Sequence, residues 1–230
     1  MKTFTSPSLI STYTEQVNSR ILGGLAHKRR AVAIIIPPVL IAIMYTIFNS
    51  LAGVLANDTI AWYLGLITYW LIWGIVFPIM MVGKKDLIAL IRPQRPTMNI
   101  LLPMSIVLLG ALSARLFVPG MGYEKQNVWI LILLLSTCFG NGFFEELLWR
   151  RVYYKLYPNS IFYRMVWPSV WFGIWHYVPV SIQNNEITAL IGMTIGPVLM
   201  GLVLSYMTKK TNTLWWAIIA HTVGGMIMVS

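Results

Sequence analysis

Long apolar stretches alternate with short polar segments along almost the whole chain. The seven apolar stretches are Ala31–Leu55, Ile60–Val82, Ile100–Val118, Val128–Trp149, about Tyr163–Val180, Ile187–Met207 and Leu214–Val229. Each is close to the length of about 20 residues that a transmembrane helix needs. The runs are continuous rather than alternating, so they do not fit the strands of a membrane barrel. The pattern predicts an all-α, polytopic membrane helix bundle of about seven or eight transmembrane helices.

Composition agrees with this prediction and limits what else the chain can contain. Hydrophobic residues make up 57% of the 230 residues, charged residues only 10%, and the mean hydropathy is +0.71. We therefore expect a cytoplasmic N-terminal segment at 1–30 and a transmembrane helical domain at 31–230, with no sizeable soluble domain. The first 20 residues have no apolar core typical of a cleavable signal peptide. Pro37 and Pro38 are expected to kink the first span.

The positive charge is distributed unevenly between the two sides of the predicted membrane. If the N-terminus is cytoplasmic, inner segments carry 15 of the 17 Lys and Arg residues, and only Arg115 and Lys125 lie outside. This bias predicts a multi-pass protein of the plasma membrane with a cytoplasmic N-terminus. The net charge of +10 then reflects contact with membrane lipids, and we expect no nucleic-acid partner. Residues Lys84–Asn99 mix basic and apolar positions and predict a short helix along the inner surface.

Two adjacent glutamates end the fourth apolar stretch. A carboxylate is costly in a membrane, so Glu145 and Glu146 form a candidate functional site. On an α-helix Glu146 and Arg150 are at i and i+4 and should pair, whereas Glu145 is turned about 100° away and has no such local partner. A structural alternative is that both glutamates only pair with Arg150 and Arg151 at the membrane edge.

Two histidines lie in separate apolar, Trp-rich stretches. His176 follows Trp175, and taken alone it fits an interfacial side chain that is bonded to a backbone carbonyl group. His221 is near the middle of the last span, where burial demands a partner. The third histidine, His27, lies beside the basic Lys28–Arg30 cluster and has no expected catalytic part.

Two chemistries fit a set of two glutamates and two histidines. Either the histidines and one carboxylate hold a metal ion, or a glutamate activates water directly while the imidazoles position it and stabilise the oxyanion. The HExxH zinc signature is absent, and no other ligand type stands at i+3 or i+4 from either histidine. We therefore expect neither a metal nor another cofactor. Cys138 is interpreted as a buried apolar thiol rather than a nucleophile.

Three segments together resemble a known family. Glu145-Glu146-Leu147-Leu148-Trp149-Arg150 is similar to an EExxxR motif, Phe172–His176 to FxxxH, and His221 to the histidine of HxxxN in the CPBP family. These intramembrane glutamic endopeptidases include the CAAX prenyl endopeptidase and bacterial proteins of bacteriocin processing or self-immunity (the ABI family). The resemblance covers about 138–230, the expected catalytic core. It implies that Glu145 and His176 activate water, that His221 donates to the oxyanion, and that Glu146 and Arg150 support the site.

One position departs from the family pattern. Gly225 stands where the family often has Asn or Asp, which removes one oxyanion donor. Loss of one such donor costs about 100- to 1,000-fold in rate. The pair Gly224-Gly225 does allow a neighbouring helix or a substrate to approach closely.

The depths of the residues give a further expectation. On straight α-helices Glu145 lies about 26 Å along a span that starts at Val128, near the inner face. His176 lies about 20 Å from that face if its helix starts at Tyr163. The two residues converge if the fifth helix starts instead at Pro168, which suits a first-turn position.

The sequence thus predicts a CPBP-type intramembrane endopeptidase that hydrolyses a peptide bond in a peptide or a membrane-associated protein, with a glutamate activating water. The alternative is a non-catalytic bacteriocin self-immunity or scaffold protein of the same fold. A third possibility is a transporter whose carboxylates relay protons, although no inverted repeat supports it.

Overall fold

The seven predicted apolar stretches lie on helices in the computed structural model, which describes residues 9–117, 128–183 and 187–229. The described residues contain no strand, so the all-α bundle is confirmed. Val118 and Lys125, which end the third stretch and mark the outer side, lie outside the described residues. In the order of the chain, with η for π-helices, the elements are α1 (Leu9–Leu55), α2 (Asp58–Tyr69), η1 (Trp70–Val76), α3 (Phe77–Val82), α4 (Lys84–Ala89), α5 (Met98–Phe117), α6 (Val128–Gly140), η2 (Asn141–Glu145), η3 (Leu147–Val152), α7 (Tyr153–Leu156), η4 (Phe162–Val166), α8 (Trp167–Ser181), α9 (Ile187–Thr211) and α10 (Trp215–Val229).

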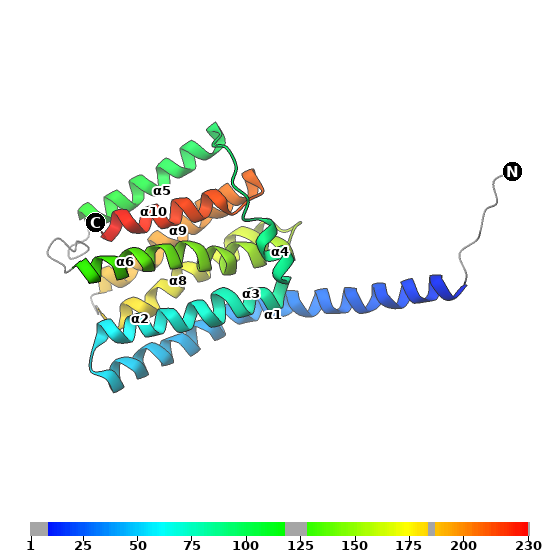
Figure 1. Cartoon of the computed structure of the whole chain (residues 1–230), viewed down its shortest axis with the longest axis horizontal. Helices are drawn as coiled ribbons and strands as arrows, with labels where there is room; N and C mark the ends of the chain where they lie inside the picture. Colours follow the sequence, from blue (N-terminus) through cyan, green and yellow to red (C-terminus); the bar gives the residue numbers. More distant parts are fainter. Residues whose placement is uncertain (1–8, 118–127, 184–186, 230) are drawn as a thin grey trace.

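The helices run side by side as a bundle, and α1 extends beyond one end of it (Figure 1). Five helical segments of the described chain are long and apolar enough to cross a membrane: Gly23–Leu55, Asp58–Val82, Met98–Leu116, Leu131–Leu156 and Ile191–Thr211. Trp215–Met228 is a shorter apolar helix. The remaining predicted span, on η4 and α8, is rich in aromatic residues. Its tryptophan and tyrosine side chains make it less apolar than the runs of aliphatic residues elsewhere.

Local sequence explains where several helices begin and end. Asn57 starts α2, because its side-chain oxygen accepts a hydrogen bond from the Ile60 amide at 3.0 Å. Gly83 separates α3 from α4 with a φ of +82°, a conformation that glycine adopts without steric cost. The predicted surface helix at Lys84–Asn99 is therefore only partly right: α4 ends at Ala89, and helical structure resumes at Met98. Pro93 and Pro96 lie between them and do not favour a continuous helix. Helix α1 continues through Pro37 and Pro38.

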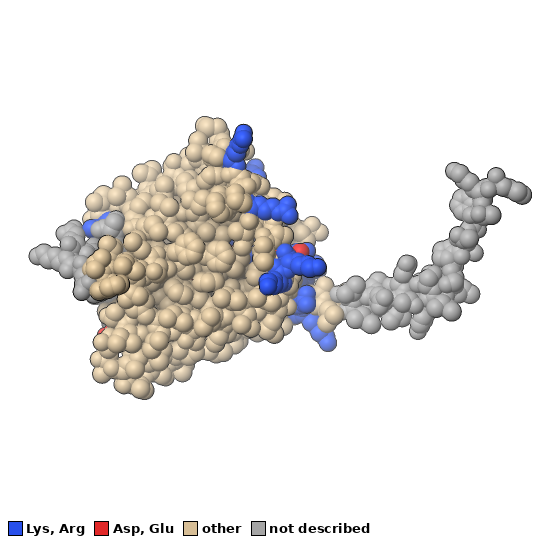
Figure 2. Space-filling model, in the orientation of Figure 1, with Lys and Arg blue, Asp and Glu red and all other residues tan. Residues whose placement is uncertain are grey.

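Basic residues gather at the end of the bundle that carries α4 (Figure 2). We call this the basic end. Backbone and side-chain contacts join four segments there. Arg30 of α1 donates to the Leu156 carbonyl at 2.8 Å, and Lys155 pairs with Asp86 of α4 at 3.0 Å. The Thr213 hydroxyl, before α10, lies 2.8 Å from the Leu90 carbonyl. The positive segments predicted on one side of the membrane thus meet at one end of the bundle.

The core lies between α1, α2, α8 and the helix that carries the two glutamates. Its largest fully buried side chains include Tyr69, Trp149, Arg150, Phe172 and Trp175. Helix α8 packs on α9, and α10 packs on α5 and on the η2 segment. These contacts bring the fourth, fifth and last spans of the sequence around one buried polar cluster.

Candidate functional site

The EELLWR segment is largely π-helical. The π-helix η2 ends at Glu145 and η3 begins at Leu147, so Glu146 lies between two stretches with i→i+5 hydrogen bonding. Such stretches are rare among helices in general, and those that occur are often found at functional sites. Gly142 allows this segment to lie against α10, because a side chain there would collide with Thr222. The wider helical turn changes the direction in which the two glutamates point.

Glu145 is buried and its two carboxylate oxygens have different surroundings. Oε1 accepts a hydrogen bond from Trp175 Nε1 at 2.7 Å. Oε2 has no hydrogen-bond partner among the described residues and lies 3.5 Å from His221 Nε2. The carboxylate is therefore fixed through one oxygen, while the other faces an imidazole nitrogen.

Glu146 is fully buried and connects an arginine to the same histidine. Its Oε1 atom lies 3.3 Å from Arg150 Nη1, as the i, i+4 spacing predicts, and 2.9 Å from His221 Nδ1. The Arg150 guanidinium also lies over the Phe172 ring, 4.2 Å from its centroid. Among the described residues Arg150 forms an ion pair with Glu146 and not with Glu145, as the spacing predicts. The contact of both carboxylates with His221 was not predicted.

His176 lies next to this cluster and is half-buried. Its Nδ1 atom is 2.7 Å from the Phe172 carbonyl oxygen. A carbonyl oxygen only accepts, so Nδ1 carries the proton, and in the neutral ring Nε2 keeps its lone pair. The Phe172 ring lies edge-on to both imidazoles, with centroids 4.6 Å from His176 and 5.5 Å from His221. His176 thus makes the bond to a backbone carbonyl that was expected for an interfacial histidine. It is also close to the second histidine, because the Phe172 ring contacts both imidazoles.

The depth expectation is partly right. The α-helix α8 begins at Trp167 with Pro168 in its first turn, but the π-helix η4 precedes it without a break, so the whole helical segment starts earlier. Both the glutamate helix and the α8 helix include π-helical turns, which hold more residues per turn than the α-helix assumed for the estimate. The two helices meet nonetheless, through the bond between Trp175 and Glu145.

The contacts do not agree with the alternative in which both glutamates only pair with Arg150 and Arg151 at the membrane edge. Arg151 approaches the backbone carbonyl and the carboxylate of Asp86 at the basic end rather than either glutamate. Of the two arginines, Arg150 pairs with Glu146, and Glu145 accepts a hydrogen bond from a tryptophan of another helix.

Sequence reasoning missed the aromatic residues that hold Glu145. The Trp175 ring stacks on Tyr69 of α2 with centroids 3.8 Å apart, and the Tyr69 hydroxyl accepts a hydrogen bond from Trp149 Nε1 at 2.9 Å. Trp149 lies inside the first motif, four residues after Glu145, and Trp175 directly precedes His176 in the second. Their places in the motifs were the available signal. Tyr69 comes from a distant part of the chain and has no motif of its own.

Gly225 packs against α6. A Cβ atom there would lie 3.3 Å from the Cys138 sulfur, so an asparagine side chain at this position would press on that helix. Cys138 itself is buried and free. Gly225 thus lets α10 approach α6 closely at Cys138, which is the close approach of a helix that was expected at this position.

The geometry does not favour a metal site. Each ring nitrogen of His221 faces a carboxylate, and one nitrogen of His176 is used by a carbonyl group. In the described part of the chain, no three His, Cys, Asp or Glu side chains are arranged to hold a metal ion.

Comparison with known proteins supports the motif-based resemblance. Residues 127–226 match the family described as Rce1-like, type II CAAX prenyl endopeptidase. This confirms the resemblance to the CAAX protease family over the region that contains both glutamates and both histidines. Neither the curated proteins nor the solved structures gave a match. The family match supports the function of a CAAX-type protease, a peptide hydrolase, and with the apolar helices it indicates a multi-pass membrane protein.

Proposed function

We propose that this chain is an intramembrane endopeptidase in which Glu145 activates a water molecule without a metal ion. The observation that carries the proposal is the difference between the two carboxylate oxygens of Glu145. Trp175 occupies Oε1, and Oε2 has no hydrogen-bond partner in the described structure. A general base needs an oxygen that can take a proton from water, and Oε2 meets this requirement in a fixed orientation.

The His221 imidazole is suited to donate a proton. Glu146 Oε1 lies 3.3 Å from Arg150 Nη1 and 2.9 Å from His221 Nδ1, and in this scheme it accepts the Nδ1–H of His221. With Nδ1 protonated, a second proton on Nε2 lies beside Glu145 Oε2, 3.5 Å away, and would be donated to the substrate carbonyl oxygen once the substrate binds between them. The imidazolium and the guanidinium then balance the two carboxylates, and the buried cluster has no net charge. Glu146 acts as a positioning residue for His221 in this scheme.

His176 is placed to hold the attacking water. Its Nδ1–H bond to the Phe172 carbonyl leaves Nε2 as an acceptor. A water molecule between Nε2 and Glu145 Oε2 would donate one hydrogen to each, and its oxygen would then attack the scissile carbonyl carbon. Glu145 takes the proton and passes it to the leaving amine, so the atoms and charges balance. This arrangement repeats the roles that the family resemblance implies.

The substrate class follows from the membrane setting and the family. We propose a peptide or a segment of a membrane-associated protein, reached from the basic end of the bundle. That end would face the cytoplasm, with the protein in the plasma membrane. Candidate substrates are those that carry a C-terminal CAAX-type sequence, as the name of the matched family suggests.

A non-catalytic role has one observation in its favour. Gly225 offers no side chain to the oxyanion, and the space around it is taken by Cys138. If the protein is a self-immunity or scaffold protein, Glu145→Gln and His176→Ala would both retain protection of cells against a cognate peptide. If protection depends on cleavage, both variants would lose it together.

The decisive experiment is a cleavage assay on purified protein with a peptide library. We expect Glu145→Gln to remove turnover while the protein stays folded and extractable, and Asp58→Asn to leave it unchanged. Asp58 is an exposed carboxylate in the first turn of α2 and serves as the matched control. Activity should persist after prolonged chelation. Wild-type rates from Glu145→Gln would overturn the glutamate mechanism, and activity lost on chelation and restored by zinc would overturn metal independence.

A further inference from the structure

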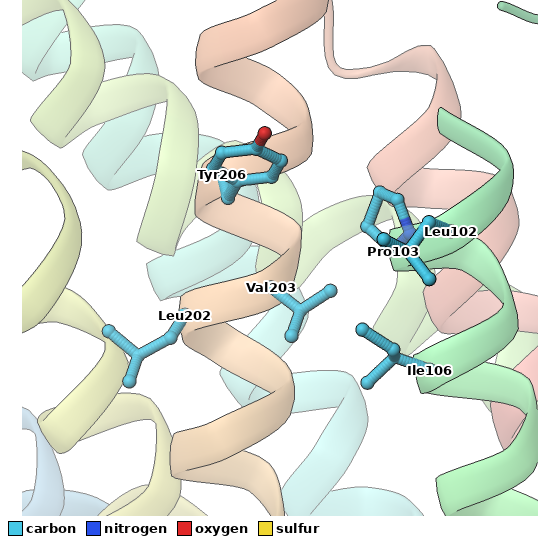
Figure 3. A pocket seen from close by; sticks show the side chains of 6 residues that line it. All are labelled: Leu102, Pro103, Ile106, Leu202, Val203 and Tyr206. Atoms are coloured by element: carbon cyan, nitrogen blue, oxygen red, sulfur yellow. The ribbon is translucent and has the colours of Figure 1, made fainter. Parts of the chain in front are cut away.

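A groove between α5 and α9 is separate from the glutamate cluster. It has a volume of about 320 Å³ and is lined by Leu102, Pro103, Ile106, Leu202, Val203 and Tyr206. Val203 of α9 points toward Pro103 and Ile106 of α5, and the Tyr206 ring lies about one turn further along α9 (Figure 3). None of the glutamates and histidines of the candidate site lines this groove.

The groove lies in the half of the membrane next to the basic end. Leu102 and Ile106 are four and eight residues after the start of α5, which corresponds to about 6 and 12 Å at 1.5 Å per residue. Tyr206 and Leu202 are five and nine residues before the end of α9, or about 8 and 13 Å. One leaflet of hydrocarbon is about 15 Å thick, so the groove matches the depth of one lipid chain.

The rim of the groove is basic. Lys209 and Lys210 are exposed in the last turn of α9, and the Lys210 ammonium lies 5.6 Å from the centre of the Tyr206 ring. The segment before α5 carries the exposed Arg92. It is held close to the end of α9, because the Thr213 hydroxyl lies 2.9 Å from the Arg92 carbonyl oxygen. Cationic side chains therefore stand at headgroup level directly above an apolar groove.

We infer that this groove and its basic rim bind one anionic phospholipid of the adjacent leaflet. One acyl chain lies between α5 and α9, and the headgroup phosphate meets Lys209, Lys210 and Arg92. The apolar groove would hold the acyl chain, and the basic rim would hold the anionic headgroup. A neutral lipid would use only the first of these features, whereas each cation near the surface favours an anionic lipid about fivefold. This site goes beyond the proposed protease function and does not depend on it.

Photo-cross-linking can test both halves of the site. The protein is reconstituted with phosphatidylglycerol or phosphatidylcholine that carries the same photoreactive acyl chain, and labelled peptides are mapped by mass spectrometry. We expect peptides of α5 and α9 to be labelled by phosphatidylglycerol at least about tenfold more than by phosphatidylcholine. The double variant Lys209→Gln/Lys210→Gln should lose most of this preference, and Lys84→Gln/Lys85→Gln, at the same end but on α4, should keep it.

Filling the groove tests the acyl-chain half. Ile106→Trp should remove labelling of α5 and α9 by both lipids, and Val203→Trp should do so from the opposite wall. Leu109→Trp, at an exposed position of α5 outside the groove, is the matched control and should label as wild type. Equal labelling by both lipids, or unchanged labelling in both groove-filling variants, would overturn the inference. Displacement of the label by a prenylated peptide but not by unlabelled phosphatidylglycerol would also overturn it and assign the groove to substrate.

Discussion

Two clusters of charged residues lie in opposite surroundings. The glutamate cluster (Glu145, Glu146, Arg150 and His221) is buried, and the Asp86 cluster (Asp86, Arg151 and Lys155) lies at the basic end. Glu145 and Glu146 are 1% and 0% exposed and meet only buried partners. Asp86, in contrast, has a side chain that is 44% exposed and pairs with the half-exposed Lys155 at 3.0 Å. Removing one member of a buried pair leaves an uncompensated charge, whereas an exposed pair contributes little. We therefore expect the same type of substitution to have very different effects in the two clusters.

The clusters also differ in what orients their side chains. Aromatic rings surround the glutamates, with Trp175 bonded to one carboxylate and Phe172 against Arg150 and both histidines. Asp86 is oriented by cationic side chains of α7 and η3. Packing against rings fixes a group more firmly than long flexible side chains do, because the rings lose less conformational freedom. The buried cluster is thus suited to a reaction, and the exposed one to setting the position of α4.

After the loss of Glu145 itself, replacing His221 should have the largest effect on turnover. His221→Gln removes a side chain that contacts both glutamates, together with the expected oxyanion donor. We expect turnover to fall by about 1,000-fold, the upper end for one donor. The measurement is kcat on the cleaved peptide, with His27→Gln as control, since His27 is exposed and distant from the site in the sequence. Turnover within tenfold of wild type would mean that His221 is not the proton donor.

Glu146→Gln should affect stability as much as activity. It leaves the Arg150 guanidinium buried without its carboxylate, which costs about 3–5 kcal/mol. Thermal unfolding in detergent would measure this loss. The double variant Glu146→Gln/Arg150→Met removes both charges and should recover most of the stability, but not the turnover, because His221 has lost its orienting carboxylate. If the double variant recovers turnover as well, Glu146 has no positioning role.

Trp175→Phe should have a smaller effect and one that is confined to catalysis. The substitution keeps an aromatic ring against Tyr69 and removes only the Nε1–H bond to Glu145. A hydrogen bond to a charged group contributes about 1.5–3 kcal/mol, so kcat should fall about 10- to 100-fold with little change in KM. Trp171→Phe on the same helix is the matched control, because the Trp171 indole makes no hydrogen bond among the described residues. Equal effects of the two variants would contradict the assigned role of Trp175.

The sequence was sufficient for the fold because apolar runs of membrane length leave few alternatives to a helix. It also drew attention to Glu145, Glu146, Arg150, His176 and His221, since polar side chains are costly in such runs and few were present. The structure brings these residues together, and their catalytic roles stay a prediction. The sequence could not show that the glutamate helix is π-helical, because no residue type specifies i→i+5 bonding. The register is set by the contact of η2 with α10, which is a tertiary feature.

The partners of Glu145 were hidden for a related reason. Trp175 is one of several tryptophans, and only the tertiary structure distinguishes the one that donates to Glu145 from Trp171, which does not. Tyr69 is far from the motifs along the chain and reaches the site because α2 packs in the same core. Residues that act through packing, rather than through an unusual charge, leave little signal in one sequence.

Asp86→Asn should have the smallest effect and gives the other side of the comparison. The hydrogen bond from Lys155 holds the pKa of Asp86 below its usual value of 3.8. A lowered pKa means that the ion pair stabilises the fold above that usual value, and that the contribution is lost as the pH falls through the lower folded-state pKa. Because the pair is exposed, Asp86→Asn should cost at most about 1 kcal/mol at pH 7, progressively less as the pH falls below 3.8, and less in 1 M salt than at low salt. Unfolding in detergent at these pH values and salt concentrations measures all three effects. A loss at pH 7 as large as that of Glu146→Gln would show that exposure does not distinguish the two clusters.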